Sequence, residues 1–429
     1  MVALTEEERR MLDGEKGPAV TKAMELLVRY ADALGAEDFV YTNNIAGVPG
    51  SSPQWVKDYY REDGGDYRAV FSRFDLDSDE VVDVPRMNAF SCHLQGGMDP
   101  DLWRDQGMSE DAFANFRSDE EQVAAHGIQV LKTCTPYLAG NVPVMGEHCA
   151  WMESSAVVFC NSVIGGRTNC EGRESTSAAM LANRIPNWGF HRDDFRKGQH
   201  SVQVEVPVHD IFEWGMLGYF VGGAVEDAIP VIEGSVGSPS LIRHKHFGAA
   251  AASSGGVEMY HMVGITPEAP DAETAFGGAR RGERFVYDAA ARRQVYEKLN
   301  SMGKDTAVDY VMLGCPHYSA EQIAYAASLL EGRKVHEDCE LWIFTSRAVK
   351  ATAQASGHTE ILCRAGAKLM TDTCSAISRA VPEGTRVAAF DSAKQTHYLP
   401  AMVGIQGWYG TTAECIDAAC TGRWEGRLS

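Results

Sequence analysis

Residues 309–317 read DYVMLGCPH, an apolar run that ends in a turn with a cysteine, a proline and a histidine. An apolar run without polar alternation is typical of a strand that is buried on both faces of a parallel sheet. Two further runs end in the same way, GIQVLKTC at Cys134 and AGAKLMTDTC at Cys374. We therefore expect three strands that each carry a thiol, as at Cys315, to the carboxyl edge, where open α/β sheets bind ligands.

Three thiolates that meet at this edge can hold an iron–sulfur cluster and leave one iron without a protein ligand. Such an iron serves as a Lewis acid and not as an electron carrier. Each cysteine taken alone more often reflects core packing, because buried cysteine is a common small apolar residue. Cys315 is the least typical of a core residue, because Cys-Pro followed by His317 is a polar arrangement. The chain has no C-x-x-C pair, so a zinc ribbon is not predicted.

The composition is that of a large acidic protein. The chain has 429 residues, eleven cysteines and a formal net charge of -20, and this length suffices for two or three domains. A net negative chain repels phosphate backbones, so we expect no nucleic-acid partner. The start, MVALTEEERR, lacks a signal-peptide pattern, and no apolar run reaches the length of a membrane span. We therefore expect a cytoplasmic protein with reduced thiols and no membrane partner.

From residue 127 onward, strand-like apolar runs alternate with helix signals, which predicts an α/β fold with largely parallel sheets. Capping-box pairs open helices after Thr5, Ser319 and Thr411, and a helical pattern from residue 19 stops at Gly35. The further strand-like runs are SAVVFCNSVIG (155–165), VEMYHMVGI (257–265), ELWIFTS (340–346) and RVAAF (386–390).

We divide the chain into three α/β domains. Residues 1–130 form the first and carry an irregular acidic insertion near 47–83. Residues 131–300 form a central domain with a substrate-binding loop, and residues 301–429 form a third with two of the three cysteines. The Gly/Ser/Pro-rich stretch 234–240 and the loop 266–282 are further candidate domain boundaries.

The densest polar stretch is residues 145–173, where acidic, imidazole and hydroxyl groups flank an apolar run that ends in GGRTN. A guanidinium, a hydroxyl, an amide and backbone N–H groups on one loop suit a carboxylate or a phosphate. An ordinary polar loop with an ion-paired arginine fits as well. We expect catalytic groups at Glu147 and His148, and substrate-binding groups at Ser154, Ser155, Arg167, Thr168 and Asn169.

Two later stretches add candidates. Ser254, Gly255 and Gly256 in SSGG form a turn whose backbone amides can approach an anion. Lys394 and His397 in DSAKQTHYLP follow an apolar strand and can act in proton transfer. A plain turn, a solvated lysine and a core histidine are the more common interpretations of these residues taken singly.

Together, these stretches resemble the large, catalytic subunit of aconitase X, a branch of the aconitase superfamily of iron–sulfur hydro-lyases. The resemblance runs nearly end to end, and its specific stretches are CTPY, GEHCAWMESSAVVFCNSVIGGRTN, SSGGVEMYHMVGITPEA, LGCPH, DTC and SAKQTHYLP. It implies an aconitase-like core of three α/β domains around a central cleft. It also implies an iron–sulfur cluster (4Fe-4S or 2Fe-2S) whose metal ligands are Cys134, Cys315 and Cys374.

The known activities of the family are dehydrations, of cis-3-hydroxy-L-proline in bacteria and of mevalonate 5-phosphate in archaea. A separate swivelling β-rich domain carries a serine base and is either fused or a small subunit. No segment of this chain remains for it, so the resemblance implies a swivel-domain subunit as a partner and a heteromer. The base is then expected from that partner, with His148 or Lys394 assisting and Glu147 orienting His148 or carrying protons.

The chain departs from the family pattern at three places. TNNI replaces SAHI, so Asn44 stands where the family has histidine, and PRMN replaces TTLN, which keeps the substrate-binding candidate Asn88 and adds Arg86. RTNCEG replaces RTNREG, so Cys170 takes the place of a second arginine. Loss of that guanidinium argues against a dianionic phosphate substrate.

We therefore predict an iron–sulfur-dependent dehydratase of a small hydroxy acid, of the cis-3-hydroxy-L-proline type. The first alternative is a mevalonate 5-phosphate dehydratase large subunit. A mononuclear metal hydrolase that uses Cys315, His317 and another thiol is a second. A non-catalytic scaffold member of the family, suggested by Asn44 and Cys170, is a third.

Overall fold

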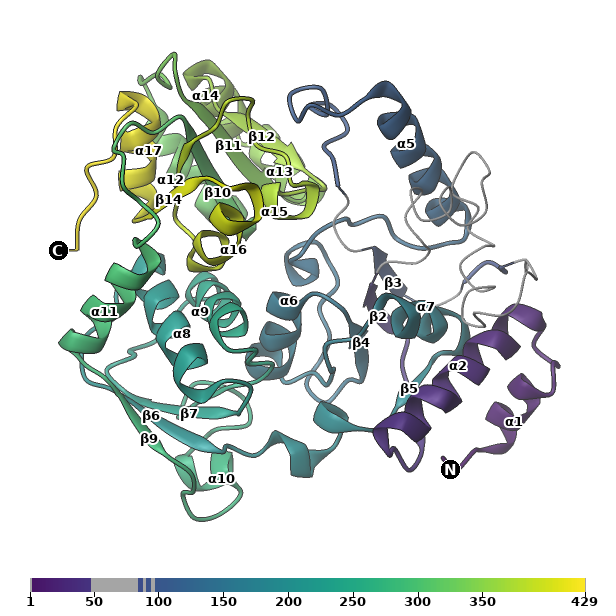
Figure 1. Cartoon of the computed structure of the whole chain (residues 1–429). Helices are drawn as coiled ribbons and strands as arrows, with labels where there is room; N and C mark the ends of the chain where they lie inside the picture. The colour runs from purple at the N-terminus through teal and green to yellow at the C-terminus, as the bar shows by residue number, and fades with distance from the viewer. Residues whose placement is uncertain (1, 48–83, 88–89, 94–96, 429) are drawn as a thin grey trace. The chain divides into compact units, whose positions relative to one another are not determined.

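The structure is a computed structural model that describes residues 2–47, 84–87, 90–93 and 97–428. The acidic insertion, except for its first residue, and the predicted substrate-binding residue Asn88 lie outside the described residues. The chain forms two compact units, whose helices and strands are labelled in Figure 1. The first unit contains Met1–Leu94, Ser109–Leu131 and Asn141–Arg196, and the second contains Gln95–Met108, Lys132–Gly140 and Lys197–Ser429.

The first unit is built on a three-stranded parallel sheet of order β3-β2-β4. Its strands are β2 (Asn44–Gly47), β3 (Phe90–His93) and β4 (Cys149–Trp151). A small antiparallel pair joins β1 (Phe39–Tyr41) to β5 (Arg184–Pro186). Apolar side chains of the helices cover these strands, as Leu27 and Ala178 do beside Ile45. The helices are α1 (Glu6–Leu12), α2 (Pro18–Leu34), α5 (Glu110–Ala125), α6 (Ser154–Phe159) and α7 (Arg173–Ala182), with a π-helix η2 (Cys160–Ile164) and two 3₁₀ turns, η3 (Gly189–His191) and η4 (Asp193–Arg196).

The second unit contains a five-stranded parallel sheet of order β12-β11-β10-β13-β14. Its strands are β10 (Tyr310–Tyr318), β11 (Glu340–Thr345), β12 (Lys368–Thr371), β13 (Val387–Phe390) and β14 (Gln406–Tyr409). The helices that follow them are α12 (Ala320–Leu330), α13 (Arg347–Ala355), α14 (His358–Ala365), α15 (Ser375–Ser378), α16 (Ala393–Val403) and α17 (Thr412–Thr421). This is the alternation of strand and helix that parallel pairing requires.

The central strand β10 is buried along its whole length, which explains its unbroken apolar sequence. Val311 and Leu313 pack into the core beneath α12 and α17, whereas Tyr310 and Met312 face the opposite core with α16. At Gly314 the backbone has φ +97°, and a Cβ there would lie 2.2 Å from the carbonyl oxygen of Phe344. The pairing with β11 shifts between Leu313 and Tyr318, so the strand leaves its ladder where the cysteine stands.

A four-stranded parallel sheet of order β8-β7-β6-β9 belongs to the same unit. Two long helices next to it, α8 and α9, pack closely because Gly218 lets the backbones touch: a Cβ there would lie 2.2 Å from the carbonyl oxygen of Phe247. The strands are β6 (His200–Val204), β7 (Pro230–Gly234), β8 (His261–Met262) and β9 (Arg284–Tyr287), and the helices are α8 (Ile211–Val225), α9 (Leu241–Ser254), α10 (Ala272–Phe276) and α11 (Ala289–Leu299).

The predicted α/β fold with largely parallel sheets is confirmed, and so are its best-marked helices. The capping boxes at Thr5, Ser319 and Thr411 form as expected, and α2 ends at Gly35 in the left-handed conformation. Each capping box satisfies two backbone donors at once, which is why one pair of residues suffices to predict each of these helix starts.

Three predicted strands are wrong or much shorter. Residues 127–134 form no strand, and Cys134 lies in a loop. SAVVFCNSVIG forms α6 and η2 instead of a strand, and VEMYHMVGI contains only the two residues of β8. A short apolar run does not distinguish a buried strand from a buried helix, and burial alone produced these runs.

The division into three domains with boundaries at residues 130 and 300 stays a prediction. The two compact units instead change over after Arg196, and the second unit takes in two earlier segments of the chain. A search of the described residues finds no helix with the length and apolarity that a membrane span needs.

Replacing Thr411 with alanine is expected to destabilise the protein by about 1 kcal/mol, because the Thr411 Oγ1 accepts the Glu414 N–H at the start of α17. The free energy of urea unfolding measures the change. Thr352→Ala on the exposed face of α13 is the matched control. An equal loss in both variants would contradict a capping role.

Candidate thiol site and the polar loop of the first unit

Two of the three predicted thiols lie at the carboxyl edge of the five-stranded sheet. Cys315 sits in the irregular end of β10, and Cys374 caps α15 three residues after β12 ends. Cys134 reaches the same unit in a loop just before the 3₁₀ turn η1 (Pro136–Leu138). None of the three forms a disulfide, and all are buried, with 6%, 7% and 5% exposure for Cys134, Cys315 and Cys374.

The side chain of His317 joins the loops that carry these thiols. Its backbone N–H donates to the Cys134 Sγ at 3.3 Å. Its Nδ1 lies 2.9 Å from the Oγ1 of Thr133, next to that cysteine. Its Nε2 lies 2.9 Å from the carbonyl oxygen of Thr373, next to Cys374. His317, two residues after Cys315, therefore contacts the residues that directly precede Cys134 and Cys374.

These contacts define the roles of the ring nitrogens. A carbonyl oxygen only accepts, so the Nε2–H of His317 donates to Thr373, and a neutral ring then accepts the hydroxyl hydrogen of Thr133 at Nδ1. The ring has no remaining lone pair for a metal ion. A mononuclear metal site with His317 as a ligand would have to displace one of these two contacts, and this alternative stays a prediction.

A buried lysine on α9 supports the turn that follows Cys315. The Lys245 Nζ donates to the carbonyl oxygens of Pro316 (3.3 Å) and His317 (2.7 Å) and to the Gln322 Oε1 (2.5 Å). Burial lowers the pKa of Lys245 to about 8, and the negative charge available from Cys134, Asp391 and Cys315 opposes that shift. The ammonium thus satisfies backbone carbonyls that the sheet has released.

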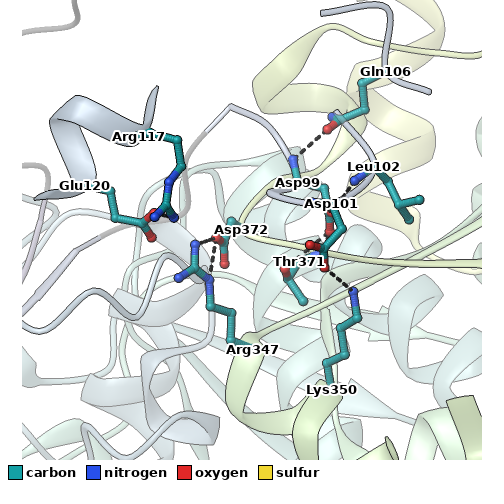
Figure 2. Close-up of polar contacts among 10 residues, drawn as sticks. All are labelled: Asp99, Asp101, Leu102, Gln106, Arg117, Glu120, Arg347, Lys350, Thr371 and Asp372. Atoms are coloured by element: carbon teal, nitrogen blue, oxygen red, sulfur yellow. Dashed lines mark hydrogen bonds and ion pairs between the residues drawn. The ribbon is translucent and has the colours of Figure 1, made fainter. Parts of the chain in front are cut away.

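The three residues before Cys374 are each contacted by another side chain. The buried Asp99 Oδ2 accepts the Thr371 N–H at 2.6 Å, and Arg347 donates to the Asp372 Oδ2 at 2.7 Å (Figure 2). His317 contacts Thr373 as described. The other carboxylate oxygen of Asp99 accepts backbone N–H groups of its own turn, at Asp101 and Leu102. The loop that presents Cys374 is therefore fixed residue by residue.

The chemistry of these donors fits an iron–sulfur cluster. Thiolates are the usual ligands of such clusters, and an N–H donated to a sulfur stabilises the thiolate form. Within the residues that the structure describes, no three His, Cys, Asp or Glu side chains already stand as a metal-binding group. The role of the three cysteines as ligands therefore stays a proposal.

In the first unit, His148 pairs with a histidine that the sequence did not single out. The Nδ1 atoms of His148 and His191 lie 3.0 Å apart. Burial, followed by the positive charges of Arg167 and Arg196, lowers the pKa of His148. Burial lowers the pKa of His191 to about 3, with His148 and then Arg196 and Arg167 adding to the shift. Both rings are therefore neutral at pH 7.

The Glu147 carboxylate makes its hydrogen bonds to groups other than His148, and its catalytic role stays a prediction. Its Oε1 accepts the Asn44 Nδ2 at 3.2 Å, and its Oε2 accepts the Val144 N–H at 2.9 Å. The Asn44 Oδ1 in turn accepts the indole N–H of Trp151 at 3.0 Å. The asparagine that departs from the family pattern is thus a buried residue with both ends of its side chain hydrogen-bonded.

The remaining groups of this polar loop hold the loop itself together. Arg167 donates to the carbonyl oxygen of His191 at 2.8 Å and pairs with Asp193. The Asn169 side chain uses both ends, donating to the Trp188 carbonyl and accepting the Phe190 N–H. The other predicted groups are also engaged: the Thr168 Oγ1 accepts the Trp151 N–H, the Ser155 Oγ donates to Glu153, and Ser154 begins α6. Their substrate-binding role stays a prediction.

The SSGG stretch forms the end of a helix and not an open turn. The Ser254 Oγ donates to the Ala250 carbonyl, and the Gly255 N–H donates to the Ala251 carbonyl. Gly256 follows with φ +102°. Helix carboxyl ends carry partial negative charge, so the placement of Ser254, Gly255 and Gly256 does not favour anion binding.

Lys394 and His397 lie on α16, directly after β13. The His397 Nδ1 lies 2.9 Å from the Tyr219 Oη, and burial, followed by the charge of Lys298, lowers the pKa of His397. Lys394 is half-buried at the first turn of the helix. Their catalytic roles stay predictions.

Comparisons with known proteins identify the family. Three domain models of aconitase X match the chain: the first domain over residues 1–194, the second over 198–297 and the third over 308–421. The crystal structure of Thermococcus kodakaraensis aconitase X (holo-form) matches with a TM-score of 0.81 and 29% identity, covering 97% of this chain and 100% of that one.

Two relatives of this chain are named after different substrates. The phosphomevalonate dehydratase large subunit of Methanocaldococcus jannaschii is 33% identical over 96% of this chain and 99% of its own. The cis-3-hydroxy-L-proline dehydratase of Pseudomonas aeruginosa is 35% identical over 97% of this chain and 70% of its own. The chain belongs to the aconitase X family, and its enzyme class is that of the dehydratases.

The buried pair in the first unit predicts a dependence of stability on pH. An unfolded histidine has an ordinary pKa near 6.5, whereas folded His191 has one of about 3, so acid favours the unfolded chain and stability falls between these values. At pH 5 the expected loss from His191 is about 2 kcal/mol. His191→Gln should reduce the difference in unfolding free energy between pH 7 and pH 5. The exposed His209→Gln is the control, and an unchanged difference in His191→Gln would refute the assignment.

Proposed function

We propose that this chain is the large subunit of an iron–sulfur-dependent dehydratase of a small hydroxy acid, of the cis-3-hydroxy-L-proline type. The observation that carries the proposal is the arrangement around His317, which contacts the neighbours of Cys134 and Cys374 from the turn of Cys315. Three buried thiols on loops with shared contacts are what a cluster with one open iron needs.

The three cysteines would hold the cluster, which would supply a Lewis acid for the departing hydroxyl. The chain's own contribution is to preset its surroundings. The His317 N–H donates to the Cys134 sulfur and favours its thiolate form. The Lys245 ammonium lies beneath the turn of Cys315 and offsets part of the negative charge that three thiolates bring together.

Substrate recognition is assigned to Arg167 and Asn169, with Thr168, Ser154, Ser155 and Asn88 as further candidates. Arg167 can receive a substrate carboxylate by exchanging its exposed partner Asp193, whose side chain is 78% exposed. Proton abstraction is assigned to a base of a small swivel-domain subunit, with His148 or Lys394 assisting. Neutral His148 is suited to accept a proton, because burial, followed by the positive charges of Arg167 and Arg196, lowers its pKa and keeps it uncharged.

The partner proposal rests on the relatives. The Methanocaldococcus protein and the corresponding protein of Methanothermobacter thermautotrophicus, 36% identical, are named large subunits. The Pseudomonas relative extends beyond the matched region, since the match covers 70% of it. A separate small subunit would therefore complete the enzyme.

Position 170 favours the hydroxyproline type over the phosphate type. Cys170 is exposed and contacts the carbonyl oxygen of Met152, where the family pattern has an arginine. A dianionic phosphate needs more positive charge than the ion-paired Arg167 supplies. Mevalonate 5-phosphate remains the second candidate substrate, because relatives with that activity in their names match as well as the others.

The substrate prediction is tested with the anaerobically reconstituted protein, supplied with its small subunit. Loss of water from cis-3-hydroxy-L-proline, followed by proton NMR, is expected to be at least about ten-fold faster in kcat/KM than from mevalonate 5-phosphate, a difference of about 1.4 kcal/mol. Faster turnover of the phosphate ester would reverse the assignment. Turnover of neither compound would support a scaffold role.

Cys315→Ser is expected to abolish bound iron and sulfide and to leave the fold intact. Serine is nearly the same size but supplies no soft thiolate ligand. Iron and acid-labile sulfide are measured after anaerobic reconstitution, with circular dichroism as the check on folding. Cys339→Ser is the matched control, because Cys339 has the same 7% exposure as Cys315 and lies outside the contacts of His317. Full iron content in Cys315→Ser would overturn the ligand assignment.

A further inference from the structure

We propose that His317 is a positioning residue that presets the three thiols before any cluster is bound. This inference rests on the proposed function, in which Cys134, Cys315 and Cys374 are the ligands. His317 is not one of the ligands. It holds the Cys134 loop with one ring nitrogen and the Cys374 loop with the other, while its own backbone belongs to the turn of Cys315.

The need for such a residue follows from the local structure. Cys134 lies in a loop, Cys374 follows the end of a strand, and Cys315 lies where β10 leaves its ladder. Segments without a regular ladder lose conformational entropy when they are ordered. Three sulfurs that approach as thiolates also repel one another. The hydrogen bonds of the buried His317 ring order the loops before metal binds, and so they offset both the loss of conformational entropy and the repulsion between thiolates.

The other supports of the site act on one loop each. Asp99 and Arg347 hold the Cys374 loop at Thr371 and Asp372. Lys245 holds the turn after Cys315 through the carbonyl oxygens of residues 316 and 317. The His317 ring bridges two loops, so its loss changes their mutual placement and not only the order of one of them.

The two hydrogen bonds of the His317 ring, to Thr133 and to Thr373, can be removed separately. In His317→Asn the amide oxygen takes the place of Nδ1, so the contact with Thr133 is kept and that with Thr373 is lost. In His317→Gln the amide nitrogen takes the place of Nε2, so the opposite contact is kept. The hydrogen bond from the backbone N–H to Cys134 survives in both variants, because neither introduces proline.

The first readout is the reactivity of individual thiols in the metal-free, reduced chain. Alkylation rates are measured by mass spectrometry of labelled peptides. His317→Asn is expected to raise the rate at Cys374 roughly ten-fold with little change at Cys134, and His317→Gln to do the reverse. A ten-fold change corresponds to about 1.4 kcal/mol, the size of one buried hydrogen bond. Cys339 serves as the internal reference for global unfolding.

The second readout is cadmium binding to the same metal-free chain. The thiolate-to-cadmium absorption is expected to report three thiolates in the wild type and about two in each variant. Thr133→Val, which removes the hydroxyl that contacts Nδ1 and that also accepts the Thr135 N–H, is expected to raise the alkylation rate at Cys134 at least as much as His317→Gln. Thr135→Val is its control, because it keeps both of these contacts and removes only the one between the two threonine hydroxyls. If the histidine variants do not fold, as faster alkylation of Cys339 would show, the test is a rise at Cys134 in Thr133→Val that Thr135→Val does not show.

Unchanged alkylation of Cys134 and Cys374 in the folded variants, together with three thiolates on cadmium, would overturn the positioning role. Failure of the proposed function gives a different result. In that case the wild type does not bind cadmium through three thiolates and takes up no iron after reconstitution. The selective changes in alkylation of the variants still occur.

Discussion

The thiol site depends on the way in which β10 leaves its sheet. A strand in the middle of a parallel sheet has its backbone groups paired on both sides, and any group released from the ladder needs another partner when it is buried. After Gly314 the pairing with β11 shifts, and the released groups of the next residues find partners in the side chains around them. The Lys245 ammonium takes two carbonyl oxygens, and the Cys134 sulfur takes the N–H of His317. The site is therefore assembled from the partners that a broken strand requires.

The strongest sequence signals were those in which one short segment determines its own structure. Strand β10 could be predicted because its burial on both faces excludes polar residues, and the capping boxes because two side chains satisfy two nearby backbone donors. The edge on which Cys315 and Cys374 stand followed from parallel pairing. The loop of Cys134 was predicted as a strand and is not one, because its apolar residues reflect burial without ladder hydrogen bonds.

The groups that support the site could not be found in the same way. Lys245, Asp99 and Thr133 make their contacts with residues far away in the sequence, and no local pattern marks them. Lys245 stands in the polar run RHKH (243–246), which gives no sign that His244, Lys245 and His246 are all buried on α9. His191 was equally unmarked, since its partner His148 is recognised only in three dimensions. For the same reason, the sequence does not show that the fold itself engages the side chains of the catalytic candidate Glu147 and the substrate-binding candidate Asn169.

The division of the second unit among three separate stretches of chain has a consequence for synthesis in the cell. Cys134 leaves the ribosome 183 residues before the backbone N–H that hydrogen-bonds to its sulfur. A contact of such long range closes late, so the nascent thiol spends that interval outside its final environment. Oxidation or capture of a stray metal in this interval would leave a chain that has its sheets in place but has lost one sulfur for its site. The order of the segments thus leaves the nascent Cys134 thiol without this hydrogen-bond donor until residue 317 has been synthesised.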